Sequence, residues 1–149
     1  MFPPEKRAVV EPRGIRVSEE RATIVVVEDE PDLADLYAAW LDDRYDVHVA
    51  YGGEEALSVV NDVDDVEVVL LDRRMPVVSG DEVLTTLRDR GVDARVAMVT
   101  AVEPDFDIVA MGFDDYLVKP VSRDALEETV SQLLLRDEYA AGVQELFSL

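Results

Sequence analysis

The side chains with the clearest chemical potential each follow a short apolar run. They are two adjacent carboxylates after the first run, a carboxylate after the third, a hydroxyl at the end of the fourth and an amine after the fifth: Glu28, Asp29, Asp72, Thr100 and Lys119. Three converging carboxylates would repel one another unless a proton or cation lay among them, and hard oxygen ligands favour Mg²⁺. A metal, a hydroxyl and an amine around one carboxylate meet the needs of a phosphoryl group. Asp72 would then be a nucleophile.

Composition limits the alternatives to this site. Because 34 residues are acidic, the pair Glu28-Asp29 could also follow a strand by chance. Lys119 carries more weight, since Lys6 is the only other lysine. The chain has no cysteine and one histidine, His48, which excludes thiolate chemistry, disulfides and multi-histidine metal sites. A bound metal must therefore be held by oxygen.

The apolar runs alternate with segments of helical periodicity, which is typical of parallel strands buried on both faces. An α/β fold with a doubly wound parallel sheet follows from this alternation. Such sheets bind ligands beyond the carboxyl ends of their strands, where the chemical side chains lie. The expected strands are Thr23–Val27, Val47–Ala50, Val66–Leu71, Arg95–Thr100 and Asp115–Val118.

Five helices are expected between and after the strands, from about Pro31, at 54–61, from Ser79, at 104–111 and from Ser122. The third should begin with a capping box, because Glu lies three residues after the serine. The stripes expected to face the sheet are Leu33, Leu36, Tyr37, Trp40 and Leu41 in the first helix, Val83, Leu84 and Leu87 in the third, and Leu126, Val130, Leu133 and Leu134 in the fifth.

Charge and hydropathy predict a globular cytoplasmic protein. The formal net charge is -20, which repels nucleic acid and anionic membranes, so no direct binding to either is expected. The longest apolar runs are far shorter than the roughly 20 residues of a membrane-spanning helix, and the first residues lack the features of a secretory signal. Such a surface repels itself unless counterions are abundant, which suggests a halophilic source.

Four motifs carry a resemblance to a known family: VVVEDEP, LLDRRMPVVSG, VTA and DDYLVKP. Over residues 22–135 the chain resembles the response-regulator receiver domain of two-component signal transduction, in a haloarchaeal form. The resemblance implies a flavodoxin-like sheet of five parallel strands in the order 2-1-3-4-5 with five helices. It implies a signalling switch rather than an enzyme, with a histidine kinase or phosphotransfer protein as the phosphodonor.

The resemblance also implies a role for individual residues. Asp72 would accept the phosphoryl group, and Mg²⁺, for which Mn²⁺ could substitute, would lie between the carboxylates and a backbone carbonyl. Phosphorylation would remodel the face formed by the fourth helix, fifth strand and fifth helix, which would bind a second copy or a downstream protein. The implied sets are Glu28, Asp29, Asp72 and the Arg74 carbonyl for metal, Thr100, Ala101 and Lys119 for phosphate, Thr100 and Tyr116 for the switch, and Pro120 for a cis peptide bond.

Some positions depart from the commonest family pattern. Glu28 replaces a frequent Asp, and Arg73 and Arg74 follow the phosphoacceptor where apolar or small groups are common. Arg74 could shield a phosphoryl group from water and prolong its lifetime. Tyr116, without its motif, would be a half-buried strand aromatic. Two other functions stay open: a pseudo-receiver that binds partners without phosphorylation, and an aspartate-nucleophile phosphatase, which would usually have Asp where Arg74 stands.

The ends of the chain differ from its centre. Residues 1–21 contain three prolines and no apolar periodicity, which predicts a disordered tail. Residues 136–149 repeat apolar side chains at Tyr139, Val143 and Leu146, which predicts a short amphipathic helix. This segment resembles the start of the HalX extension of receivers in salt-loving archaea, and it would belong either to a stand-alone regulator or to a truncated output region.

Overall fold

The computed structural model describes the backbone of residues 21–105 and 111–147, with side chains as far as residue 136. Its centre is a sheet of five parallel strands in the order β2-β1-β3-β4-β5, as the resemblance implied. Only one predicted strand differs, since β2 begins one residue earlier. The strands are β1 Thr23–Val27, β2 Asp46–Ala50, β3 Val66–Leu71, β4 Arg95–Thr100 and β5 Asp115–Val118.

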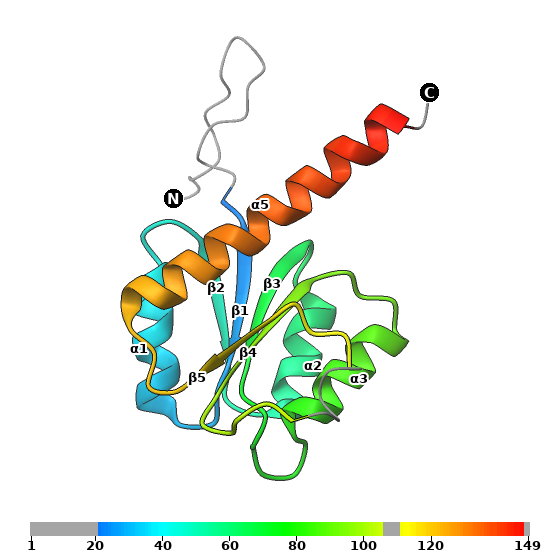
Figure 1. Ribbon diagram of the computed structural model, residues 1–149. Coiled ribbons are helices and arrows are strands. Elements are labelled where there is room, and N and C mark those ends of the chain that lie inside the picture. The colour runs from blue at the N-terminus through cyan, green and yellow to red at the C-terminus, as the bar shows by residue number, and fades with distance from the viewer. Residues whose placement is uncertain (1–20, 106–110, 148–149) are drawn as a thin grey trace, which may run out of the picture.

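Helices cover both faces of the sheet, which confirms the doubly wound fold. They are α1 Pro31–Leu41, α2 Gly53–Asp62, α3 Gly80–Asp89 and α5 Arg123–Phe147. Figure 1 shows α1 and α5 on one face and α2 and α3 on the other. The helix predicted at 104–111 falls largely on 106–110, outside the described residues. Within the described ranges no helix has both the length and the apolar character needed to cross a bilayer.

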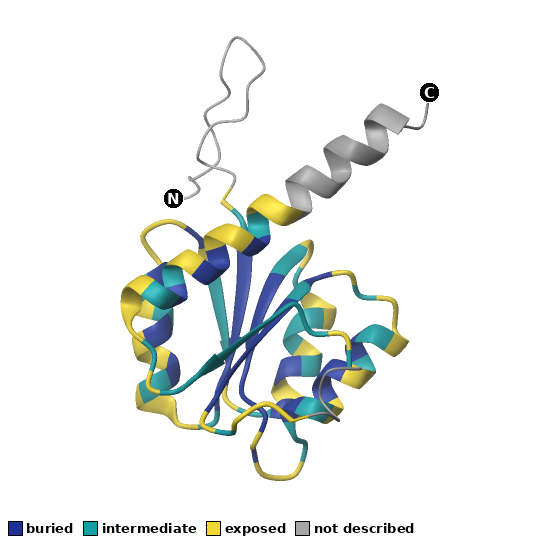
Figure 2. Ribbon diagram, in the orientation of Figure 1, coloured by how far each residue is buried: buried dark blue, intermediate teal, exposed yellow. Residues whose placement is uncertain are grey.

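The core has two halves because successive strand residues point to opposite faces. Val25 and Val27 lie in the half beneath α2 and α3, whereas Ile24 and Val26 lie in the half beneath α1 and α5. All four are at most 2% exposed, and Figure 2 shows the central strands in the colour of buried residues. Burial on both faces explains why the strands read as continuous apolar runs.

Local sequence signals account for the helix starts. Pro31 is at the first position of α1, where its missing N–H costs no hydrogen bond. The capping box of α3 is confirmed, with Glu82 N donating to Ser79 Oγ at 3.2 Å and Ser79 N donating to Glu82 Oε1 at 3.0 Å. This cap fixes where the loop after β3 ends.

The predicted apolar stripes face the sheet with one exception. Tyr37 and Leu41 of α1 are buried and Trp40 packs against the same core, but Leu36 is 43% exposed. Leu36 lies about 100° around the helix from Tyr37, beyond the edge of the packed face. The stripes of the other two helices are confirmed, with Val83, Leu84, Leu87, Leu126, Val130 and Leu133 at most 1% exposed and Leu134 packed against the core.

The C-terminal helix is longer than predicted. The sequence indicated one helix from Ser122 and a separate short helix after Leu135, but the backbone is a single helix of 25 residues ending at Phe147. The predicted boundary between 135 and 136 therefore falls inside a helix. Figure 1 shows the last turns of α5 extending beyond the sheet.

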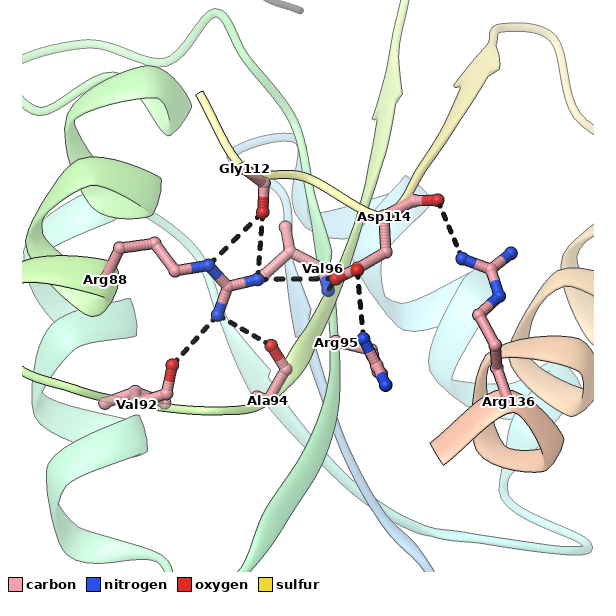
Figure 3. Close-up of polar contacts among 8 residues, drawn as sticks. All are labelled: Arg88, Val92, Ala94, Arg95, Val96, Gly112, Asp114 and Arg136. Carbon is pink, nitrogen blue, oxygen red and sulfur yellow. Dashed lines mark hydrogen bonds and ion pairs between the residues drawn. The ribbon is translucent and has the colours of Figure 1, made fainter. Parts of the chain in front are cut away.

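Hydrogen bonds from Arg88 connect α3 to the residues just before β4 and β5, as Figure 3 shows. Its guanidinium donates to three backbone carbonyls and to the Asp114 carboxylate. Asp114 in turn accepts from the backbone N–H of Val96 at 2.8 Å and from Arg95 at 3.3 Å. The carbonyls are those of Val92, Ala94 and Gly112. This network lies at the opposite end of the strands from the side chains singled out above.

Candidate functional site

The three predicted carboxylates lie together at the carboxyl edge of the sheet, at the bottom of Figure 1. Glu28 and Asp29 follow β1 and Asp72 follows β3, the neighbouring strand. The backbone N–H of Asp72 donates to the Val27 carbonyl at 3.1 Å, which continues the pairing of the two strands. One carboxylate oxygen from each acidic residue lies within 4.8 Å of the others. The parallel sheet thus brings together residues 44 positions apart in the chain.

Lys119 joins this cluster from the end of β5. Its Nζ donates to Glu28 Oε1 at 2.7 Å and to Asp72 Oδ2 at 3.1 Å. The backbone of Lys119 is held by its N–H, which donates to the Thr100 carbonyl at 2.8 Å, and the Lys119–Pro120 peptide bond is cis. The amine therefore bridges two carboxylates that extend from different strands.

Burial makes these charges depend on one another. Glu28 is 2% exposed, and this burial raises its pKa although hydrogen bonds from Lys119 and the Glu30 backbone oppose the rise. Burial lowers the pKa of Lys119, but its hydrogen bonds to Glu28 and Asp72 outweigh burial and leave that pKa raised. Lysine at this site stays protonated. Three carboxylates lie together here and the single amine contacts two of them, so this oxygen donor set fits a hard divalent cation.

The loop after Asp72 is packed against its backbone. The Arg74 N–H donates to Asp72 Oδ1 at 3.3 Å, and the Gly80 N–H donates to the Arg73 carbonyl at 2.8 Å. A Cβ on Gly80 would overlap the Asp72 carbonyl oxygen, so this close approach requires glycine. The start of α3 and the carboxylate-bearing residue are therefore in direct contact.

The other predicted residues, Thr100, Ala101 and Tyr116, lie on β4 or β5 or directly after β4. Thr100 ends β4 fully buried, with its Oγ1 accepting from the Val102 N–H at 3.4 Å, and Ala101 next to it is exposed. Tyr116 is partly buried in β5, and its hydroxyl donates to the Val102 carbonyl at 2.6 Å. The roles of Thr100, Ala101, Tyr116 and the Arg74 carbonyl stay predictions.

Sequence reasoning missed the contacts of Arg73. Its side chain is buried between Asp81 at the start of α3 and Tyr116 on β5. The sequence showed Arg73 only as an unusual charge directly after Asp72. No spacing rule links it to Asp81 or Tyr116, because these contacts depend on how α3 and β5 lie across the sheet edge.

Comparison with known families decides what kind of domain carries this site. The model of the family described as "Response regulator receiver domain" matches residues 24–131, which is most of the chain. The chain belongs to this family. Receiver domains are regulatory modules of two-component signalling rather than classical enzymes, in agreement with the sequence resemblance.

Relatives of the receiver come from archaea and bacteria. A Haloferax volcanii protein named "Putative transcriptional regulator" is 56% identical over 95% of this chain and 25% of its own length. The Bacillus subtilis alkaline phosphatase synthesis transcriptional regulatory protein PhoP is 35% identical over 83% of this chain and 52% of its own. The receiver thus spans between a quarter and about half of these relatives. The Haloferax match agrees with a haloarchaeal source.

Two solved structures share the fold of this chain along nearly their whole length. The Francisella response regulator 1452 receiver domain superposes with a TM-score of 0.73 at 28% identity, covering 78% of this chain and 99% of that one. A CheY-like receiver domain protein from Methanospirillum hungatei superposes with a TM-score of 0.72 at 24% identity, covering 80% and 99%.

Proposed function

We propose that this receiver accepts a phosphoryl group on Asp72 from the phosphohistidine of a histidine kinase or phosphotransfer protein. The observation that carries the proposal is the buried Asp72 carboxylate, which contacts Lys119 beside two further carboxylates. A carboxylate oxygen of Asp72 attacks phosphorus, the P–N bond breaks, and its electron pair leaves with the imidazole, which is reprotonated. The product is an acyl phosphate that water later hydrolyses.

The oxygen ligands of the site would hold Mg²⁺ or Mn²⁺. Glu28, Asp29, Asp72 and the Arg74 carbonyl are the proposed ligands, and the ion would neutralise charge on the phosphoryl oxygens. Glu28 would also hold the Lys119 amine in place, since it accepts the shorter of the two hydrogen bonds from Lys119. The side-chain length that distinguishes Glu28 from the commoner Asp thus helps to orient Lys119.

The other residues of the site would bind the phosphoryl group and respond to it. Lys119, the Thr100 hydroxyl and the Ala101 backbone would contact its oxygens. Thr100 and Tyr116 would pass the change to the face that includes β5 and α5, where a second copy or a downstream protein binds. Arg74 is exposed, so its proposed shielding of the phosphoryl group requires the side chain to fold back. An unchanged acyl-phosphate half-life in Arg74→Ala would reject that role.

The wider context of the receiver is also proposed. We place the receiver proper at 22–135, with a tail before it and a HalX-like extension from 136, in a cytoplasmic signalling protein. The net charge of -20 argues against direct contact of this chain with nucleic acid. The regulator named in the Haloferax match is a much longer protein, and its name does not decide what this chain binds.

Intact mass after incubation with acetyl phosphate and Mg²⁺ in high salt tests the proposal. We expect a gain of one phosphoryl group that requires the divalent cation and is lost in Asp72→Asn. The exposed Asp89→Asn is the matched control and should gain the group normally. No gain by folded protein would favour the pseudo-receiver, and turnover of p-nitrophenyl phosphate would favour the phosphatase.

A further inference from the structure

Arg73, the residue after Asp72, connects three elements through its guanidinium. Its Nε and Nη2 donate to the two carboxylate oxygens of Asp81 on α3, each at 3.0 Å. Its Nη1 donates to the Tyr116 hydroxyl on β5 at 3.1 Å. The Arg73 side chain is only 10% exposed, so these bonds are largely shielded from water. A two-point carboxylate contact holds the planar guanidinium in one orientation, which fixes the direction of the third donor.

The Tyr116 side chain is fixed at both its hydroxyl and its ring. The hydroxyl accepts from Arg73 and donates to the Val102 carbonyl at 2.6 Å. The ring makes an edge contact with Phe113, with centroids 5.5 Å apart, and packs against the core half beneath α2 and α3. These contacts hold the ring against the core, an orientation that we call inward. An outward ring would have left this core for solvent.

We propose that Arg73, anchored by Asp81, is a positioning residue that keeps the Tyr116 ring inward. The proposal rests on the proposed function only for the meaning of Tyr116 as the switch side chain. Arg73 follows the phosphoacceptor directly, so the loop bearing Asp72 contacts Tyr116 by a route that does not pass through Thr100. Arg73 thereby sets the balance between inward and outward rings, and a phosphoryl group would shift a balance already biased inward.

Fluorine NMR of protein labelled with 3-fluorotyrosine in high salt tests the proposal. The chain has five tyrosines, and Tyr116→Phe identifies the resonance of interest. Line broadening by a soluble paramagnetic agent measures how exposed the ring is. We expect Arg73→Gln to lower the ratio of inward to outward rings about tenfold, the size expected for loss of one hydrogen bond to a charged group.

Two further variants separate positioning from general damage. Asp81→Asn keeps Arg73 but weakens its anchor, so Tyr116 should become more exposed in the same direction and by a smaller factor. Arg44→Gln makes the same charge change at an exposed arginine and should leave the Tyr116 resonance unchanged. If Arg73→Gln fails to fold, the exposure of Tyr116 in Asp81→Asn tests the proposal by itself. A Tyr116 resonance identical to wild type in a folded Arg73→Gln or Asp81→Asn protein would overturn the proposal.

The fluorine measurement needs no phosphodonor, so it is independent of the proposed function. Exposure of Tyr116 in Arg73→Gln, in a protein whose mass does not change with acetyl phosphate, would keep the positioning role and reject phosphorylation. The opposite pair of results would reject the positioning role and keep phosphorylation. If both proposals hold, acetyl phosphate should return the ring of Arg73→Gln toward the inward orientation and move the wild-type ring less.

Discussion

The charged residues at the carboxyl edge of the sheet stabilise one another, because a buried carboxylate is unfavourable without a positively charged partner. Glu28 and Asp72 are buried, and the Lys119 amine lies between them at 2.7 and 3.1 Å. One amine cannot neutralise three carboxylates, so a divalent cation should stabilise the folded protein. The sequence predicted these residues from their place after strands, but spacing does not reveal which of the carboxylates the Lys119 amine contacts.

Removal of the Asp29 carboxylate should weaken stabilisation by Mg²⁺. Free Mg²⁺ at about one hundred times its dissociation constant should add about 2.7 kcal/mol to the free energy of unfolding of the wild type. In Asp29→Asn we expect about tenfold more Mg²⁺ to be needed for the same gain, because an anionic carboxylate ligand becomes a neutral amide oxygen. Thermal unfolding at constant ionic strength measures this. Asp89→Asn, an exposed change on α3, should respond like wild type, and an equal response of Asp29→Asn would contradict the metal site.

Val77 in the loop after Asp72 should be replaceable with a gain in stability. Its φ is 70° and it is 88% exposed, so a β-branched side chain occupies left-handed backbone with little packing in return. Such strain costs roughly 1 to 3 kcal/mol. Val77→Asn should raise the free energy of unfolding by about 1 kcal/mol, because Asn tolerates this conformation. Val77→Thr keeps the branched Cβ and should bring no gain in chemical denaturation; a gain equal to that of Asn would reject strain as the cause.

The helices and strands were predictable wherever burial imposed a regular pattern. All five strands and the start of α3 followed from the sequence, because burial on both faces leaves continuous apolar runs and a capping box joins residues three positions apart. Leu36 was placed on the buried stripe of α1 but lies at its edge, since periodicity does not say how wide the covered face is. The continuity of α5 past residue 135 was missed because the change in apolar pattern there reads like a boundary.

Replacing Arg88 tests how much its hydrogen bonds between α3 and the sheet contribute to stability (Figure 3). Its contacts join α3 to carbonyls before β4 and before β5, and its side chain is 29% exposed. Arg88→Met keeps much of the apolar stem and removes the donors, so we expect a loss of about 2 kcal/mol in the free energy of unfolding. Chemical denaturation checks this. Arg90→Met, an exposed change one half-turn on, should cost far less, and equal losses would contradict the role given to the Arg88 contacts.

The whole molecule carries a formal charge of -20, which sets the conditions under which the fold is stable. Like charges on a small domain repel one another, and added salt shortens their range from about 30 Å at 0.01 M to about 3 Å at 1 M. The Haloferax relative at 56% identity agrees with a salt-rich setting. The net charge could be counted from the sequence, whereas its effect on folding depends on how the acidic groups are spread over the surface.

Folding should therefore depend on salt. On transfer from molar to dilute KCl we expect the far-ultraviolet circular dichroism of the helices to be lost, because screening falls and repulsion favours the expanded chain. A neutral osmolyte at matched osmolality should not restore the signal, which separates screening from water activity. Full circular dichroism in dilute salt would contradict the halophilic interpretation.

The central claim is that Asp72 is the residue that carries the phosphoryl group. Borohydride reduction of protein treated with acetyl phosphate and Mg²⁺ converts an acyl-phosphorylated aspartate to homoserine, and peptide mass spectrometry then locates it. We predict homoserine at position 72 and none in protein treated without the phosphodonor. Homoserine at position 29, reduction of Glu28 in place of Asp72, or no reduced residue in folded protein would contradict the account.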